Sequence, residues 1–285
     1  MNAGSAEEGG VDTGRLDSVL APLRQQSDRS AILTDVDGTI APIVADPAEA
    51  SVPEATRELL RLLAKRYALV GCLSGRRALD ARRVVGLDDL AYSGNHGFEL
   101  LLPGDTEVRP DPSLDGHEED APRFVGGLDR SELERVGIRT EDKGAIVALH
   151  WRGAANETAA ESLAQEIASE AEWEGLIPHR GRKVLEIRPN VAINKGIAVA
   201  ALIASHPAAT NNAAESIDHA LYGGDDRTDI DAFAALRTLQ EDRELETAVC
   251  IAVASDESPP EVAGAADLTV PGPEGFVRVL EGLGE

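Results

Sequence analysis

The chain has 285 residues, of which 42% are hydrophobic and 3% aromatic, and its formal net charge is −24. Such a length can build one large or two modest domains, and the strong acidity argues against nucleic acids and anionic membranes as partners, because both attract basic surfaces. A small anionic substrate stays compatible with this charge, because a site needs only local cations or a metal ion.

The two cysteines and the N-terminal residues indicate a compartment. Cys72 and Cys250 each lie inside an apolar run, and we interpret them as small buried residues rather than a disulfide framework, which points to a reducing environment. The first residues lack the basic and apolar regions of a signal peptide, and no apolar run approaches membrane-spanning length. We therefore expect a cytoplasmic protein with no membrane partner.

The first part of the chain alternates between amphipathic segments and short apolar runs. Residues 1–14 have no apolar period and are expected to form a disordered tail. The expected elements that follow are a helix over 16–23, a strand over 32–34, a helix over 53–65 with Ser51 as its N-cap, a strand over 67–73 and a helix ending near 85. This alternation predicts a parallel sheet with right-handed crossovers.

The pattern changes in the middle of the chain. Residues 103–122 are rich in Pro, Gly and Asp and are expected to form an exposed loop or hinge. Beyond it the expected elements are strands over 145–151 and 183–188 and a helix over 157–172, and then helices over 197–205, 228–239 and 274–283 with strands over 220–222 and 249–253. The sequence thus predicts an α/β core over 15–100 and 190–285, with an α+β cap domain inserted at 101–189.

Two carboxylates, Asp35 and Asp37, follow the strand expected at 32–34. Parallel α/β sheets bind ligands in the crevice at the carboxyl ends of their strands, which is where these acids are expected. One acid can attack phosphorus and the other can carry a proton. Taken alone, the motif also fits an Asp-Gly turn with a spare acid.

Three further motifs have complementary chemistry. Ser74 ends the second strand and can donate to a phosphate oxygen, although a plain Ser-Gly turn is the alternative. Lys195 opens a helix and can hold a phosphoryl group, although helix-start lysines are often only solvated. Asp225, Asp226 and Asp229 cluster after a strand and suit Mg²⁺, although Asp229 alone also fits a helix-capping acid.

In this order, the four motifs resemble those of the haloacid dehalogenase superfamily of aspartate-nucleophile phosphatases. The resemblance implies a Rossmann-like core, a parallel sheet flanked by helices, with an inserted cap, and Mg²⁺ as cofactor. It implies Asp35 as nucleophile, Asp37 as general acid and base, and Ser74 and Lys195 as phosphoryl-binding residues. The implied metal site comprises Asp35, the backbone carbonyl of Asp37, Asp225 and, through a metal-bound water, Asp229.

Segments outside these motifs narrow the resemblance to trehalose-6-phosphate phosphatases. Residues 93–99, 141–152, 181–189 and 224–233 are similar to that family's segments, and the similarity spans about 31–280. It implies hydrolysis of trehalose 6-phosphate, with a trehalose-6-phosphate synthase of the same pathway as the expected partner. The implied substrate-binding residues are Arg76, Asn95, His96, Glu99, Lys143, His150, Arg152, Lys183 and Glu186.

The chain also departs from that family's pattern. Val36 replaces an aromatic residue, Trp151 a tyrosine and Ile230 an acid, and the acidic loop over 111–120 resembles no segment of that family's pattern. The alternative functions are hydrolysis of another sugar phosphate or of a glyceryl-glycoside phosphate, and a catalytically silent protein that binds sugar phosphates. For the cap residues, the alternative is a solvated sheet face.

Overall fold

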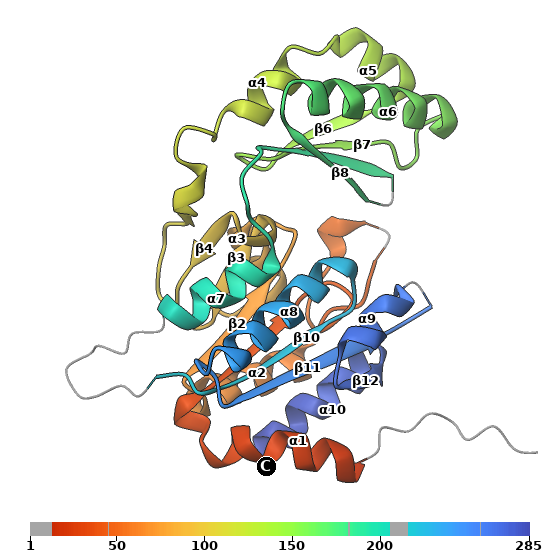
Figure 1. Cartoon of the computed structure of the whole chain (residues 1–285). Coiled ribbons are helices and arrows are strands. Elements are labelled where there is room, and N and C mark those ends of the chain that lie inside the picture. Colours follow the sequence, from red (N-terminus) through yellow and green to blue (C-terminus); the bar gives the residue numbers. More distant parts are fainter. Residues whose placement is uncertain (1–12, 45, 182, 206–215, 257) are drawn as a thin grey trace, which may run out of the picture. The chain divides into compact units, whose positions relative to one another are not determined.

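The computed structural model describes residues 13–44, 46–181, 183–205, 216–256 and 258–285. The chain divides into two compact units, of which the first comprises residues 1–109 and 193–285 and the second residues 110–192 (Figure 1). The second unit begins after the insertion point expected at 101, because residues around that position still belong to strands of the first unit. Most of the tail expected over 1–14 lies outside the described residues, and helix α1 (Thr13–Gln25) already begins within it.

The first unit, here called the core, is built on an eight-stranded sheet with the order β12-β11-β10-β1-β2-β3-β4-β5. Its strands are β1 (Ser30–Asp35), β2 (Leu69–Leu73), β3 (Ala91–Gly94), β4 (Glu99–Leu101), β5 (Arg109–Pro110), β10 (His219–Gly224), β11 (Thr247–Ala254) and β12 (Leu268–Pro271). Neighbouring strands from β12 to β3 are parallel, whereas β4 runs antiparallel to β3. The predicted α/β core with a mainly parallel sheet is therefore confirmed.

Helices cover both faces of the core sheet, because side chains alternate along each buried strand. In β1, Ile32 packs into one apolar cluster and Ala31 and Leu33 into the other. The first cluster includes side chains of α1, α2 (Glu54–Arg66), α3 (Ala78–Val85) and α10 (Gly272–Gly284). The second includes side chains of α7 (Lys195–Ser205), α8 (Arg227–Glu241) and α9 (Pro260–Ala265).

Some local expectations are wrong. Helix α2 begins at Glu54 with Pro53 as its flanking residue and no side-chain cap, so Ser51 stands too early in the chain to cap it. The segment expected as a loop over 103–122 contains β5, the short 3₁₀ turn Pro112–Leu114 and the start of α4 (Asp120–Gly126). Other 3₁₀ turns occur at Ser27–Arg29, Pro47–Glu49 and Asn95–Gly97.

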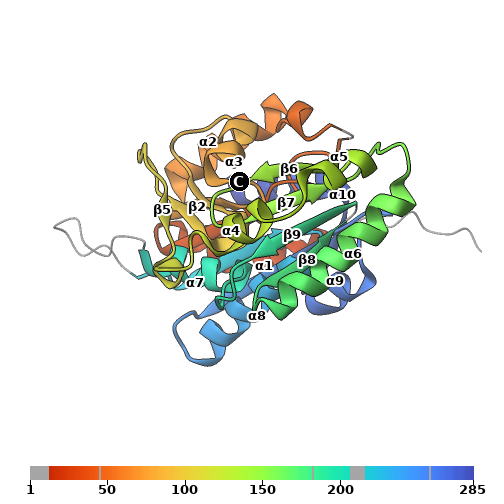
Figure 2. The same ribbon diagram turned by 90° about the horizontal axis from the view of Figure 1, so that it is seen from above.

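The second unit, here called the cap, contains an antiparallel sheet with the order β6-β7-β9-β8. Its strands are β6 (Arg139–Asp142), β7 (Val147–His150), β8 (Ile177–Gly181) and β9 (Val184–Arg188), and its helices are α4, α5 (Arg130–Val136) and α6 (Glu157–Trp173). Leu149, Leu185 and Ile187 pack with apolar side chains of these helices, as strand alternation predicts. Helix α6 runs along this sheet (Figure 2).

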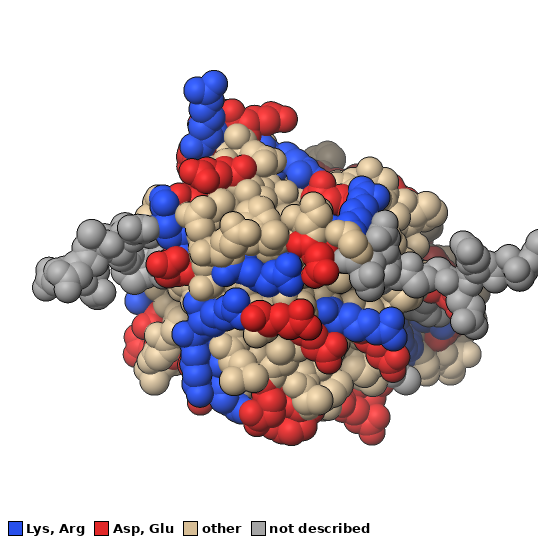
Figure 3. All heavy atoms as spheres, turned by 90° about the horizontal axis from the view of Figure 1, so that it is seen from below, with Lys and Arg blue, Asp and Glu red and all other residues tan. Residues whose placement is uncertain are grey.

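Acidic and basic side chains are interspersed on the surface seen in Figure 3. That face carries no broad patch of basic residues among those described, in keeping with the net charge of −24. Of the helices that the structure describes, none is long and apolar enough to cross a membrane.

Candidate active site

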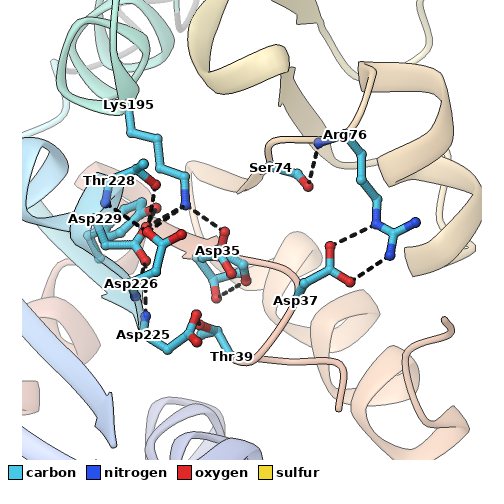
Figure 4. Close-up of polar contacts among 12 residues, drawn as sticks. Asp35, Asp37, Thr39, Ser74, Arg76, Lys195, Asp225, Asp226, Thr228 and Asp229 are labelled. Atoms are coloured by element: carbon cyan, nitrogen blue, oxygen red, sulfur yellow. Dashed lines mark hydrogen bonds and ion pairs between the residues drawn. The ribbon is translucent and has the colours of Figure 1, made fainter. Parts of the chain in front are cut away.

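The four motifs lie at strand or helix ends of the core. Asp35 is the last residue of β1 and is in register with Leu73, the last residue of β2, so Ser74 follows directly on the neighbouring strand. Asp225 follows β10, which pairs with the other side of β1, and Lys195 is the first residue of α7. Figure 4 shows these side chains around the carboxyl ends of the central strands.

Lys195 is the centre of the site. Its ammonium donates to Oδ1 of Asp35 at 2.6 Å and to Oδ1 of Asp229 at 2.7 Å. The lysine is 1% exposed and Asp35 is 5% exposed. Burial by itself would lower the pKa of Lys195, but the two carboxylates outweigh it and raise that pKa well above its ordinary value. The two carboxylates thus favour the charged form of Lys195, which is held beside Asp35.

Asp229 has hydrogen-bond donors on both of its oxygens. Oδ1 accepts from Lys195 and, at 2.6 Å, from the hydroxyl of Tyr222, while Oδ2 accepts from the backbone amides of Asp225 and Asp226 at 2.9 and 3.0 Å. The bond from the Asp226 amide is one half of a capping box at the start of α8, and the other half is the bond from the Asp229 amide to the Asp226 side chain. The helix-capping alternative for Asp229 thus holds, and the same carboxylate also positions Lys195.

Tyr222 is a site residue that the sequence reasoning missed. It lies in the middle of a buried strand and makes a T-shaped contact with Phe233. In the sequence it therefore resembles an ordinary apolar core residue. The available signal was a hydroxyl-bearing aromatic residue immediately before Gly223-Gly224-Asp225. A buried tyrosine hydroxyl almost always needs a partner.

The carboxylates of Asp35, Asp225 and Asp229 fit a divalent cation. Oxygen atoms of the three buried residues lie within 4.8 Å of one another. Burial, with repulsion from Asp229 and Asp226, raises the pKa of Asp225 to about 7. Clustered hard oxygens that repel each other suit Mg²⁺, and binding would relieve that repulsion.

Gly38 allows Asp225 to approach the loop after β1. The glycine has φ of +92°, and a Cβ atom there would lie 2.3 Å from Oδ2 of Asp225. The hydroxyl of Thr39 donates to Oδ1 of Asp225 at 3.3 Å. Any side chain at position 38 would therefore both strain the backbone and push Asp225 away.

Asp37 points away from this cluster, toward Arg76 (Figure 4). The Nε of Arg76 donates to Oδ2 of Asp37 at 2.7 Å and its Nη2 donates to Oδ1 at 2.8 Å. The hydroxyl of Ser74 accepts from the backbone amide of Arg76 at 3.1 Å. Arg76, expected to bind substrate, is here the partner of Asp37.

Asn95, His96 and Glu99 brace the loop that carries Ser74 and Arg76. The amide of Asn95 donates to the carbonyl of Arg76 at 2.6 Å, and the amide of His96 donates to the carbonyl of Ser74 at 3.0 Å. Glu99 accepts from the first amide of α3 at 2.7 Å and from Nδ2 of Asn95 at 3.0 Å. Asn95 and His96 adopt φ of 50° and 58°, a conformation that costs energy outside glycine. Their substrate-binding role stays a prediction.

In the cap, Glu186 is clamped between two cations. Its Oε1 accepts from Lys143 at 2.8 Å and its Oε2 from Nη2 of Arg188 at 2.5 Å, and the residue is 7% exposed. His150 pairs with Glu141 at 2.8 Å, and this hydrogen bond lowers the pKa of Glu141. Ala148 is in register with Glu141 on one side and with Glu186 on the other. These two carboxylates therefore lie on the same sheet face, which His150, two residues after Ala148, also shares.

Lys183 and Arg152 are two further cap residues predicted to bind substrate. Lys183 pairs with Glu157, the first residue of α6, at 2.6 Å, and Arg152 is exposed in the turn after β7. Of the five cap residues predicted to bind substrate, the structure joins Lys143 and Glu186 by a direct contact.

Comparison with known proteins identifies the same family as the sequence motifs do. The trehalose-phosphatase family model matches residues 33–274. A probable trehalose-phosphate phosphatase of Oryza sativa subsp. japonica is 32% identical over 219 residues, which cover 75% of this chain and 57% of that protein. An uncharacterized glycosyl hydrolase of Mycobacterium tuberculosis is 33% identical over 212 residues, which cover 73% of this chain and 15% of that protein. The chain thus spans about half of the rice protein and a small part of the mycobacterial one.

The fold has solved counterparts. The C-terminal domain of the C. albicans trehalose-6-phosphate phosphatase superposes with a TM-score of 0.69 at 23% identity, covering 94% of this chain and 96% of that one. This likeness confirms the predicted fold class, an α/β core with a mainly parallel sheet and a second α+β unit. With a family model that matches most of its length, the chain belongs to the trehalose-phosphatase family.

Proposed function

We propose that this chain is a Mg²⁺-dependent phosphatase that hydrolyses trehalose 6-phosphate to trehalose and inorganic phosphate. One observation carries the proposal: the buried ammonium of Lys195 lies 2.6 Å from Asp35 at the carboxyl edge of the sheet. A carboxylate held beside a fixed cation and two further acids is equipped to attack an anionic phosphoryl group. Membership of the trehalose-phosphatase family supplies the substrate class.

The reaction proceeds in two steps. An oxygen of Asp35 attacks phosphorus and the bond to the sugar oxygen breaks, which leaves an aspartyl-phosphate. Asp37 gives a proton to the leaving oxygen and then takes one from the water that attacks the intermediate, as the bond between phosphorus and the Asp35 oxygen breaks and phosphate is released. Ser74 and Lys195 donate to the phosphoryl oxygens, and Lys195 offsets their charge in both steps.

The metal site would be formed by Asp35, Asp225 and the backbone carbonyl of Asp37. Mg²⁺ bound there supplies a Lewis acid that offsets the charge of the phosphoryl oxygens. Both oxygens of Asp229 accept hydrogen bonds, Oδ1 from Lys195 and Tyr222 and Oδ2 from two backbone amides, which favours an indirect role for this carboxylate through water.

The sugar is recognised by polar residues of the cap. Lys143 and Glu186 form the ion pair on the polar sheet face, and a disaccharide presents the hydroxyl groups that such donors and acceptors bind. His150, Arg152 and Lys183 add further candidates. A trehalose-6-phosphate synthase of the same pathway stays the expected partner, and the buried thiols of Cys72 and Cys250 favour a reducing compartment such as the cytoplasm.

A phosphate-release assay tests this proposal. Trehalose 6-phosphate, several hexose phosphates and a glyceryl-glycoside phosphate are compared at one Mg²⁺ concentration, with and without excess chelator. We expect the highest kcat/KM for trehalose 6-phosphate and no turnover with chelator. A preference for another ester would identify the alternative phosphatase function, and binding without turnover would identify the catalytically silent relative.

A further inference from the structure

Arg76 and Asp37 form a two-point contact. Each oxygen of the carboxylate accepts one N–H of the guanidinium, at 2.7 and 2.8 Å, and the side chains are 18% and 35% exposed. A paired contact of this kind fixes the plane of a carboxylate, which a single bond from a lysine does not. The contact therefore sets where both oxygens of Asp37 point.

The backbone of Asp37 is fixed by hydrogen bonds as well. The contact with Arg76 therefore restricts the remaining freedom of Asp37, which is rotation about its side-chain bonds. The amide of Gly38 donates to the carbonyl of Ala41 at 2.8 Å, and the amide of Ala41 donates to the carbonyl of Val36 at 2.9 Å. These bonds close a tight turn around Asp37. A half-exposed carboxylate on such a turn would otherwise rotate freely into water.

Arg76 itself is held at both ends of its backbone. Its amide donates to Ser74 at 3.1 Å and its carbonyl accepts from Asn95 at 2.6 Å. The segment beside it is closely packed, because a Cβ atom on Gly94 would clash with the backbone nitrogen of Ala78. The guanidinium is thus presented from a braced loop, as a positioning group requires.

We propose that Arg76 is the positioning residue for Asp37, holding its carboxyl group in the orientation that both proton transfers need. The inference rests on the proposed phosphatase function and deepens it. In the first step, the Asp37 carboxyl proton moves to the leaving oxygen while the P–O bond breaks. In the second, a water proton returns to Asp37 while the water oxygen bonds to phosphorus and the bond between phosphorus and the Asp35 oxygen breaks, which releases phosphate. Arg76 keeps a bond to the carboxyl oxygen that carries no proton.

This role differs measurably from the phosphoryl-binding role expected for an arginine near the site. A positioning residue for the acid matters most when the leaving group needs a proton, as a sugar oxygen does. A nitrophenolate leaves without protonation, so its release in the first step should hardly depend on Arg76. A residue that binds the phosphoryl group would affect both esters alike.

The experiment compares Arg76→Met and Arg76→Lys with the control Arg83→Met, which removes a guanidinium from the exposed side of α3. Initial turnover is measured with trehalose 6-phosphate and with nitrophenyl phosphate, together with inhibition by inorganic phosphate. For Arg76→Met we expect a loss of about 10²-fold in kcat for the sugar ester, as for the loss of a general acid. The nitrophenolate of the first turnover should be released as a burst, slowed by less than about tenfold, and be followed by a slow steady state.

Arg76→Lys keeps a cation but not the paired contact, so it should show the same substrate-dependent loss to a smaller degree. If Arg76→Met fails to fold, the two esters are compared with Arg76→Lys alone. An equal loss for both esters with weaker inhibition by phosphate would overturn the inference in favour of phosphoryl binding, and so would unchanged kinetics. If the wild type hydrolyses none of the esters, the proposed function fails with it; if the wild type is active, only the inference is at stake.

Discussion

Lys195 and Asp229 form an ion pair that is shielded from solvent. Their charged atoms lie 2.7 Å apart, and the side chains are 2% and 0% exposed. Burial makes both charges costly, and their attraction offsets part of that cost, together with Asp35 beside Lys195 and the hydrogen-bond donors of Tyr222 and two amides to Asp229. Since the same ammonium also contacts Asp35, the residue proposed for phosphoryl binding also keeps the buried acids in place.

Lys195→Met should destabilise the metal-free protein as well as inactivate it. Methionine fills a similar volume but leaves the carboxylates of Asp35 and Asp229 without their cation. Removing one partner of a buried pair costs about 3–5 kcal/mol of unfolding free energy. Urea titration of the variant beside Lys65→Met, an exposed change on α2, measures this difference. Equal midpoints for the two variants would contradict the structural role.

Stability should depend on pH through Asp225. Its pKa is about 7 in the folded metal-free protein, against about 3.9 in an unfolded chain, so the native state holds a proton that the unfolded state has lost. The retained proton stabilises the folded state. This stabilisation is complete below about pH 4 and is lost as the pH rises through about 7.

Mg²⁺ competes with that proton, so its stabilising effect should grow with pH. We expect Mg²⁺ to raise Tm more at pH 8 than at pH 6, and Asp225→Asn to remove the difference. Asp88→Asn, which changes an exposed carboxylate, is the matched control. An identical rise in Tm at both pH values would argue against a metal site at Asp225.

The fold was largely predictable because its signals are local. Apolar runs such as the one ending at Asp35 mark the strands, and the Pro-rich and Asp-rich stretch marks the region in which the second unit begins. The prediction of Ser51 as the N-cap is wrong because the sequence around 51–54 allows more than one helix start. Tertiary packing selects the start at Glu54, which Pro53 flanks. Two-residue strands such as β5 have no sequence periodicity to detect.

The site was predictable as a set of residues but not as a set of contacts. The spacing and order of the motifs identify Asp35, Lys195 and Asp229 as site residues. They do not predict the pairing of Asp37 with Arg76, which joins residues 39 positions apart. Likewise, Glu99 was expected at the substrate, and its hydrogen bonds to Asn95 and to the start of α3 appear only in three dimensions. Long-range hydrogen bonds leave no periodic trace in the chain.

The cap clamp should govern substrate selectivity. Glu186→Ala leaves Lys143 and Arg188 without their shared carboxylate, and a lost polar contact of this kind costs roughly 1–3 kcal/mol. We expect kcat/KM for trehalose 6-phosphate to fall about tenfold or more, while hydrolysis of a small phosphoester changes little. Glu166→Ala, an exposed change on α6, is the control. Parallel losses for both esters would assign Glu186 to the fold rather than to the sugar.

The central claim is that Asp35 receives the phosphoryl group of trehalose 6-phosphate. The direct measurement is rapid mixing with substrate labelled in its phosphoryl group, acid quenching within one turnover, and mapping of the label by proteolysis and mass spectrometry. We predict an acid-stable, hydroxylamine-sensitive label on the peptide that contains Asp35, which Asp35→Asn lacks while keeping the wild-type Tm within a few degrees. Release of phosphate by the wild type with no labelled Asp35 peptide at any quench time would contradict the account.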